Sequence, residues 1–363
     1  MPVAQILIAP DSFKGSATSA QVAEALANGW KISRPNDEIV IAPFADGGEG
    51  TLDCIESVTP GSVRIPITVQ GATGTDHESS WLLVGLDTAV IEMAALCGIT
   101  TVDELDPLGA HSYGLGQAIK AALEDERVNE ILIAVGGSAS TDAGMGALSA
   151  LGFKGLDSSG EEITRGGGEL HRLVRIETQE IVRKPDRGIK ILVDVHSPLT
   201  GLDGAAHIFG PQKGADESQV QQLDKGLTHF LKVLKVEDRG GFGAAGGGSC
   251  GLAVLLGATI VSGVATIAEL IGLQEKIKHS DCVITGEGSF DDQSYRGKAV
   301  GFLLEIAKES DRPVMIACGV NKNEKSPLIL SLIELAPSVQ SATTDSQRWL
   351  IECGKVLASR FNH

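Results

Sequence analysis

Five short apolar runs, which come from the two ends of the chain, constrain the fold more than any other feature of this sequence. Apolar runs that alternate with helical patterns are typical of buried parallel strands in an α/β protein. We therefore predict a flavodoxin-like parallel sheet that is assembled from both chain ends. The predicted strands are Gln5–Ala9, Glu38–Pro43, Asp281–Thr285, Arg312–Cys318 and Ile333–Pro337.

Helical patterns fill the spaces between these strands. The first of them places Val22, Ala23 and Leu26 on one face, which predicts a helix that packs on the sheet. The predicted helices are Ser19–Lys31, Gly297–Ser310, a short one at Pro327–Leu332 and, at the end of the chain, Asp345–Arg360.

The middle of the chain is predicted to form a second α/β domain, inserted into the first. Three runs there are expected to pair antiparallel because turn residues separate them, and two more end in charged or glycine-rich turns. These runs are Val63–Val69, Ser80–Gly85 and Thr88–Met93, then Ile131–Val135 and Lys190–Val193. The predicted division assigns residues 1–65 and 278–363 to the flavodoxin-like domain and residues 66–277 to the inserted domain.

Composition and charge narrow the classes of function. The 363 residues are 42% hydrophobic, enough for a substantial core, and the net charge of −17 argues against nucleic-acid binding. We find neither an apolar run of membrane-spanning length nor a signal-peptide pattern, so we expect a cytoplasmic protein that does not enter a membrane. The six cysteines have no CxxC spacing, as expected of reduced thiols. The sequence does not distinguish a monomer from a homodimer.

The loop after the first strand combines a carboxylate, a hydroxyl and a cation. Asp11, Ser12 and Lys14 lie where open α/β sheets bind ligands, at the carboxyl end of a parallel strand. Lys14 and the N–H groups that open the next helix could bind a phosphate or a carboxylate. The alternative is a structural turn in which Ser16 or Thr18 caps the helix.

The loop after the second strand places two glycines between two carboxylates. Gly47 and Gly48 let the backbone approach a ligand closely. Asp46 and Glu49 could hold Mg²⁺ or accept a proton. The alternative is a simple glycine turn with a helix cap.

A third loop, after the strand at Ile131–Val135, is rich in hydrogen-bond donors. It could cradle a phosphate, although it is not a Walker A loop because the terminal Gly-Lys-Ser/Thr is missing. The donors are Gly136, Gly137, Ser138 and Ser140. Asp142 could accept the proton of a substrate hydroxyl, or it could only cap the helix predicted at residues 144–151.

Two further loops add a carboxylate and a second lysine. Asp194 ends the strand at Lys190–Val193, and His196 beside it could be a base or a structural residue. Lys213 is restrained between Pro211-Gln212 and Gly214, which suits it to aim a charge. The alternative is an ordinary surface lysine.

The last predicted loop, after the strand at Asp281–Thr285, again sets a carboxylate among glycines. It contains Gly286, Glu287 and Ser289. The glycine-rich run at 240–251 is either a nucleotide-facing loop or a hinge between the domains. Parallel strands bring such loops to one edge of a sheet, and several carboxylates with two lysines and many backbone donors suit phosphoryl transfer.

Five of these segments resemble the type I glycerate kinase family in residues, order and spacing, and they span nearly the whole chain. They are Ala-Pro-Asp-Ser-Phe-Lys-Gly-Ser (9–16), Ala-Asp-Gly-Gly-Glu-Gly-Thr (45–51), Gly-Gly-Ser-Ala-Ser-Thr-Asp-Ala-Gly (136–144), Phe-Gly-Pro-Gln-Lys-Gly-Ala (209–215) and Ile-Thr-Gly-Glu-Gly (284–288). The segment His111-Ser112-Tyr113-Gly114 is similar as well. The resemblance implies phosphorylation of D-glycerate by ATP on O2, giving 2-phosphoglycerate, with Mg²⁺ as cofactor. It also implies two α/β domains with the active site in the cleft between them.

On this hypothesis each candidate residue has a role. Lys14 and Lys213 would hold anionic groups, and Asp194, preferred over Asp142 because it ends a strand directly, would deprotonate the attacking hydroxyl. The carboxylates of Asp46, Glu49 and Glu287 would manage Mg²⁺. The substrate and the nucleotide would contact Asp11, Ser12, Gly47, Gly48, Gly136, Gly137, Ser138, Ser140, Gly286 and Ser289.

Two residues depart from the commonest pattern of the family. Ser197 stands where the family usually has Asn, and Ser289 stands where it often has a basic residue. Both changes favour, as an alternative, a kinase for another small hydroxy acid or sugar acid. A non-catalytic metabolite sensor and an isomerase or lyase of sugar phosphates are further alternatives, and both would lack ATP turnover.

Overall fold

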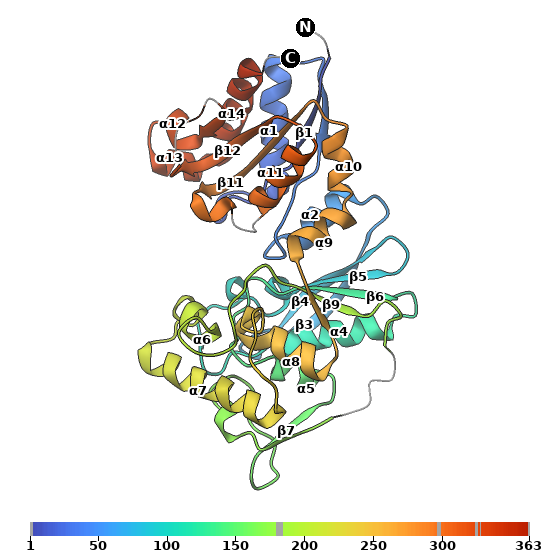
Figure 1. The fold of residues 1–363 in the computed structure, drawn as a ribbon, viewed down its shortest axis with the longest axis vertical. Helices are drawn as coiled ribbons and strands as arrows, with labels where there is room; N and C mark the ends of the chain where they lie inside the picture. Colours follow the sequence, from blue (N-terminus) through green and yellow to red (C-terminus); the bar gives the residue numbers. More distant parts are fainter. Residues whose placement is uncertain (1–2, 179–183, 296–298, 324–325, 327, 362–363) are drawn as a thin grey trace. The chain divides into compact units, whose positions relative to one another are not determined.

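The computed structural model (Figure 1) describes residues 3–178, 184–295, 299–323, 326 and 328–361. These residues form two compact units. Unit 1 comprises residues 1–46, 53–60 and 264–363, and unit 2 comprises residues 47–52 and 61–263. The boundaries differ from the predicted 65/66 and 277/278. One reason is that the strand beginning at Val63 pairs within the sheet of unit 2.

Unit 1 contains a five-stranded sheet in the order β13-β12-β11-β1-β2, in which every neighbouring pair is parallel. Its strands are β1 (Gln5–Ile8), β2 (Glu38–Ile41), β11 (Cys282–Phe290), β12 (Val314–Asn321) and β13 (Ile329–Ser331). The predicted parallel sheet from both chain ends is therefore confirmed. The sequence approximated the first four strands but not the fifth.

The predicted strand at Ile333–Pro337 is wrong. Residues Leu332–Leu335 form helix α12, and the fifth strand lies just before it, where Ile329–Ser331 pairs with β12. A short apolar run cannot be assigned to strand or helix from periodicity alone. The helix predicted at Pro327–Leu332 is wrong for the same reason, and its first residue lies outside the described residues, as does Gly297 at the start of another predicted helix.

Helices cover both faces of this sheet. Figure 1 shows α1 (Ser19–Ser33, blue) beside α14 (Ser346–Arg360, red), so the two ends of the chain pack together. Gly29 and Gly354 permit this, because a Cβ at Gly29 would lie 2.0 Å from the carbonyl oxygen of Ile351. On the other face α11 (Ala299–Glu309) buries Val300 against Ile316. The remaining helices of unit 1 are α9 (Gly263–Leu270), which starts at the unit boundary, α10 (Leu273–Lys278), α12, α13 (Val339–Thr344) and most of α2 (Thr51–Val58).

Unit 2 contains a six-stranded mixed sheet in the order β10-β9-β6-β5-β4-β3. Its strands are β3 (Val63–Gln70), β4 (Asp76–Val84), β5 (Thr88–Glu92), β6 (Glu130–Ala134), β9 (Ile189–Leu192) and β10 (Thr259–Val261). The pairs β3–β4 and β4–β5 are antiparallel, as predicted, and the other neighbours are parallel. A separate antiparallel pair joins β7 (Lys154–Leu156) to β8 (Arg175–Glu177).

The core of unit 2 lies between its sheet and its helices. The α-helices are α3 (Met93–Cys97), α4 (Tyr113–Glu124), α5 (Met145–Ala150), α6 (Ala205–Phe209), α7 (Glu217–Leu234) and α8 (Gly248–Leu255). Short 3₁₀ turns occur in both units at Ile99–Thr101, Leu170–Arg172, Pro211–Lys213, Ala244–Gly247 and Asp292–Tyr295. None of the helices in the described part of the chain has the length and apolarity to cross a membrane.

Candidate active site

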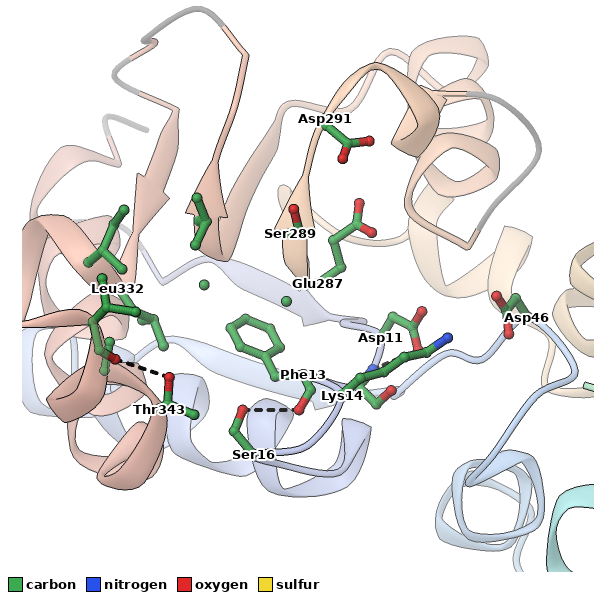
Figure 2. Close-up of a pocket in the computed structure, with 17 residues that line it drawn as sticks. Asp11, Phe13, Lys14, Ser16, Asp46, Glu287, Ser289, Asp291, Leu332 and Thr343 are labelled. Atoms are coloured by element: carbon green, nitrogen blue, oxygen red, sulfur yellow. Dashed lines mark hydrogen bonds between the residues drawn. The ribbon is translucent and has the colours of Figure 1, made fainter. Parts of the chain in front are cut away.

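A pocket of about 440 Å³ lies in unit 1 at the carboxyl ends of its strands (Figure 2). The chain passes from β1 to β2 on one side, and β11, β12 and β13 are added on the other, so the strand order reverses between β1 and β11. Ligands of open α/β sheets bind at such a switch point. The lining residues are Asp11, Ser12, Phe13, Lys14, Ser16, Asp46, Glu287, Gly288, Ser289, Asp291, Gly319, Val320, Leu332, Ile333, Val339, Ala342 and Thr343.

Three carboxylates and one lysine gather at one end of this pocket, which we call the acidic end (Asp11, Lys14, Asp46 and Glu287; Figure 2). The loop after β1 is tied to β11 because the N–H of Asp11 donates to the carbonyl of Gly286 at 2.8 Å. Burial raises the pKa of the Asp11 carboxyl to about 7, and the negative charge of Asp46 raises it as well. The N–H of Ser12, 2.6 Å away, and the charge of Lys14 oppose this rise.

The raised pKa of Asp11 predicts a pH dependence of stability. The folded protein holds this proton up to about pH 7, whereas the unfolded chain loses it near 3.8. Between these values the folded state binds more protons, so the free energy of unfolding should fall as the pH rises and level off above about 7. The free energy of unfolding in urea, measured for the wild type and Asp11→Asn across this pH range, checks the prediction. The slope attributed to Asp11 should vanish in the variant, and identical slopes would contradict the assignment.

The acidic end has the oxygen chemistry that Mg²⁺ prefers. Mutual repulsion of its carboxylates, which contributes to the raised pKa of Asp11, is what a divalent cation would relieve. Within the described residues no group of three or more metal-binding side chains is arranged to hold a metal ion by protein atoms alone. Mg²⁺ commonly binds through one or two carboxylates together with phosphates and water, so Asp11, Asp46 and Glu287 fit that mode.

Glu49 and Gly286 are not among the residues that line the pocket. Glu49 is exposed, belongs to unit 2 and does not line the pocket that contains Asp46 and Glu287. Gly286 is required for packing, because a Cβ there would lie 1.9 Å from the carbonyl oxygen of Ala317 on β12. Ser289 does line the pocket, and its buried Oγ has no hydrogen-bond partner among the described residues.

Asp291, which is not among the predicted site residues, also lines the pocket, and its Oδ2 lies 3.7 Å from the Nζ of Lys322. Its place in the sequence was a usable signal, because it directly follows β11, the strand that contains Glu287 and Ser289. Thr18 caps the helix that follows the first loop, as the structural alternative for that loop predicted. Its side chain forms a capping box with Gln21 at the start of α1, two residues beyond the pocket residue Ser16.

In unit 2 the loop after β6 meets the segment 47–52. The N–H of Gly136 donates to the carbonyl of Gly47 at 3.1 Å, and a Cβ at Gly136 would lie 2.6 Å from the Cα of Gly48. Gly136 is therefore needed for this backbone approach, and Gly47 has a φ of +88°, which favours glycine. Gly137 has a φ of +72° and accepts a hydrogen bond from the N–H of Ile99 at 2.9 Å.

Glu92, which the sequence analysis missed, anchors the same segment. It ends β5, is 4% exposed, and accepts hydrogen bonds from the N–H groups of Gly50 at 3.0 Å and Leu52 at 2.9 Å. A carboxylate at the N-terminus of α2 satisfies donors that have no partner within the helix. A single Glu at the end of a largely apolar strand could have identified this residue in the sequence.

Lys213 is buried and supports the donor-rich loop. It is only 3% exposed, and its Nζ donates to the Oγ of Ser138 at 2.9 Å and to the carbonyl of Ser140. Burial lowers its pKa to about 8, against the opposing charge of Asp142. The surface-lysine alternative is wrong. The hydroxyls of Ser140 and Thr141 are buried, and neither has a hydrogen-bond partner in the part of the chain that the structure describes.

Asp142 and Asp194 have different surroundings. Asp142 is 0% exposed and accepts four hydrogen bonds, from the N–H groups of Ser112, Gly144 and Gly146 and from the hydroxyl of Ser112. Asp194 is partly exposed, and its Oδ1 accepts from the hydroxyl of Ser262 at 2.9 Å and the N–H of Gly263 at 3.1 Å. Of the two, only Asp194 is open to a substrate.

The glycine-rich run at 240–251 packs against the donor-rich loop. A Cβ at Gly246 would lie 2.1 Å from the carbonyl oxygen of Ser140, and one at Gly251 would lie 2.1 Å from that of Ala143. The N–H of Ala143 donates to the carbonyl of Gly246 at 3.1 Å. Close backbone packing therefore explains these glycines.

Comparisons with known proteins agree on one family. The sequence model of the glycerate kinase family matches residues 6–362. The chain is 41% identical over 325 residues to the glycerate 2-kinase of Escherichia coli (strain K12), covering 87% of this chain and 85% of that protein. It is 40% identical, with the same coverage, to the glycerate kinase of Haemophilus influenzae. A crystal structure from Salmonella typhimurium LT2, of a protein proposed to be glycerate kinase 2, matches with a TM-score of 0.81 and 32% identity over 99% of this chain and 98% of that one.

Proposed function

We propose, because this chain belongs to the glycerate kinase family, that it transfers the γ-phosphoryl group of ATP to O2 of D-glycerate and so forms 2-phosphoglycerate. That it is a kinase acting on glycerate follows from the family. The donor ATP, the oxygen that is phosphorylated, the use of Mg²⁺ and a cytoplasmic location are the proposed parts. The printed name of the Escherichia coli relative, glycerate 2-kinase, supports the choice of O2.

The observation that carries the proposal is the acidic end of the pocket in unit 1. One lysine stands there with three carboxylates at the switch point of a parallel sheet. Phosphoryl transfer asks little covalent chemistry of a protein and much positioning and charge neutralisation. In our proposal Lys14 contacts the phosphoryl group that is transferred. One or two of the carboxylates of Asp11, Asp46 and Glu287 would hold Mg²⁺ together with phosphate oxygens, and the bound ion would neutralise phosphate charge.

The donor-rich loop of unit 2 supplies hydroxyls for anionic oxygens. The Nζ of Lys213 donates to the Oγ of Ser138 and to the carbonyl of Ser140, and the hydroxyl of Ser140 has no hydrogen-bond partner among the described residues. A donor held in place before the ligand arrives costs little reorganisation. We propose that this loop binds phosphate oxygens and that Asp142 positions it.

Asp194 is proposed as the group that orients and deprotonates the attacking hydroxyl. Asp194→Asn should lower kcat by about 10³-fold, with KM for glycerate changed less than about threefold, because a general base acts mainly in the transition state. Asparagine keeps an oxygen for Ser262 and Gly263, so the local geometry should survive. Steady-state kinetics check this. The exposed Asp203→Asn is the control, and near-wild-type kinetics in both variants would show that Asp194 is not the base.

The proposed function is tested with ATP, Mg²⁺ and D-glycerate in a coupled assay. The product is passed either to enolase alone or to enolase with phosphoglycerate mutase. Signal with enolase alone establishes a glycerate 2-kinase. Signal only with the mutase shows phosphorylation on O3 and overturns the proposed position. No signal from folded protein overturns the proposal and favours a different hydroxy acid or sugar acid as acceptor.

A further inference from the structure

The pocket of unit 1 has two chemically different ends. Opposite the acidic end lies a second end that is mainly hydrocarbon, which we call the apolar end. It is formed by residues of α12 and α13: Leu332, Ile333, Val339, Ala342 and Thr343. Figure 2 shows Phe13 between the two ends, with Leu332 and Thr343 on one side and Asp11, Lys14 and Glu287 on the other.

The apolar end does not suit a phosphate or a carboxylate. Of the described residues that line the pocket, Lys14 alone is cationic, and it stands at the acidic end. The hydroxyl of Thr343 already donates to the carbonyl of Val339 at 3.0 Å. An anion placed here would lose its hydration without gaining partners.

The apolar end does not suit glycerate either. Glycerate has three carbons, a carboxylate and two hydroxyls, so it offers almost no apolar surface. The cavity of about 440 Å³ lies in the size range of pockets for larger organic ligands. A ligand that fills it must carry a flat or bulky apolar group at one end and several anionic groups at the other.

We propose that this pocket binds the nucleotide, with the purine base against the apolar end and the phosphates at the acidic end. The inference rests on the proposed function, which supplies a nucleotide as co-substrate. It adds the location of the base and the residues that contact it. Leu332 and Ala342, 1% and 7% exposed, form the fixed wall, and Val339, 63% exposed, forms the rim.

Two neighbouring threonines on α13 provide a matched test. Thr343 lines the pocket and Thr344 does not, yet both are exposed and both donate a hydroxyl hydrogen bond of 3.0 Å to a carbonyl four residues earlier. Thr343→Trp should fill the apolar end, whereas Thr344→Trp should not. Binding of ATP, ADP and inorganic tripolyphosphate, each with Mg²⁺ and without glycerate, is measured by calorimetry.

We expect Thr343→Trp to raise the Kd of ATP and of ADP at least about tenfold, because the base is displaced. The Kd of tripolyphosphate, which has no base, should change less than about twofold. Thr344→Trp should bind all three ligands with nearly the affinity of the wild type. Val339→Trp and Gln340→Trp form a second pair with the same contrast, in case the first variant does not fold.

The outcomes separate this inference from the proposed function. Unchanged ATP and ADP binding in folded Thr343→Trp and Val339→Trp places the base elsewhere and overturns the inference, even if the wild type phosphorylates glycerate. Equal weakening of tripolyphosphate also overturns it, because the apolar end would then serve the phosphates. The expected binding pattern in a protein that does not phosphorylate glycerate supports the inference while the proposed function fails.

Discussion

Replacing Lys14 with methionine should lower kcat/KM for the phosphorylation of glycerate by about 10²–10³-fold. Lys14 is exposed and is the cation among the described residues that line the pocket, where it faces three carboxylates. Methionine keeps the length of the side chain and removes the charge that would oppose the developing charge on the phosphoryl group. Because Lys14 is exposed, the folded structure should tolerate the change.

A second readout distinguishes a loss of charge at the site from a general defect. Lys14 lowers the pKa of Asp11, so its removal should move that pKa above about 7, and the corresponding limb of the pH–rate profile should shift to higher pH. Lys308→Met is the control, because Lys308 is an exposed lysine of the same unit that does not line this pocket. Equal losses of activity in the two variants would contradict a role for Lys14 in the chemistry.

The sequence could predict the acidic end because of one topological rule. Asp11, Asp46 and Glu287 each lie at or just beyond the carboxyl end of a predicted parallel strand, and such ends converge whatever the distance along the chain. Glu49, only three residues after Asp46, belongs to unit 2 and does not line this pocket. Residues 47–52 pair with unit 2, and the contact of Gly48 with Gly136 that explains this is long-range and leaves no local signal.

Burial is the property that the sequence could not supply. Asp142 and Asp194 both follow strands and both looked suited to accept a proton. Only packing shows that the first is fully buried and that four donors surround it. Lys213 is a similar case, because its burial depends on contacts with residues some 75 positions earlier in the chain. The strand and helix at residues 329–335 were misassigned because a short run with five apolar residues fits either element.

Replacing Asp142 with alanine should lower the free energy of unfolding by about 3–5 kcal/mol. The change leaves the N–H groups of Ser112, Gly144 and Gly146 without their buried acceptor. It also removes a negative charge that favours the buried ammonium of Lys213. Urea unfolding measures the loss, and hydrogen exchange in β6 and α5 should locate it in unit 2.

Two further variants distinguish a structural role of Asp142 from a direct role in the reaction. Asp106→Ala removes an exposed carboxylate that accepts one hydrogen bond, from the N–H of Gly109 at 2.8 Å, and should cost less than about 1 kcal/mol. Asp142→Asn should lose stability too, because an amide N–H₂ must replace an acceptor oxygen among donors. If Asp142→Asn instead kept the stability of the wild type and lost turnover, the carboxylate would act on the substrate, and the positioning role would be wrong. The four hydrogen bonds to Asp142 favour a different result. We expect Asp142→Asn to lose stability, and to lose activity only to the extent that the loop of Ser138 and Ser140 is displaced.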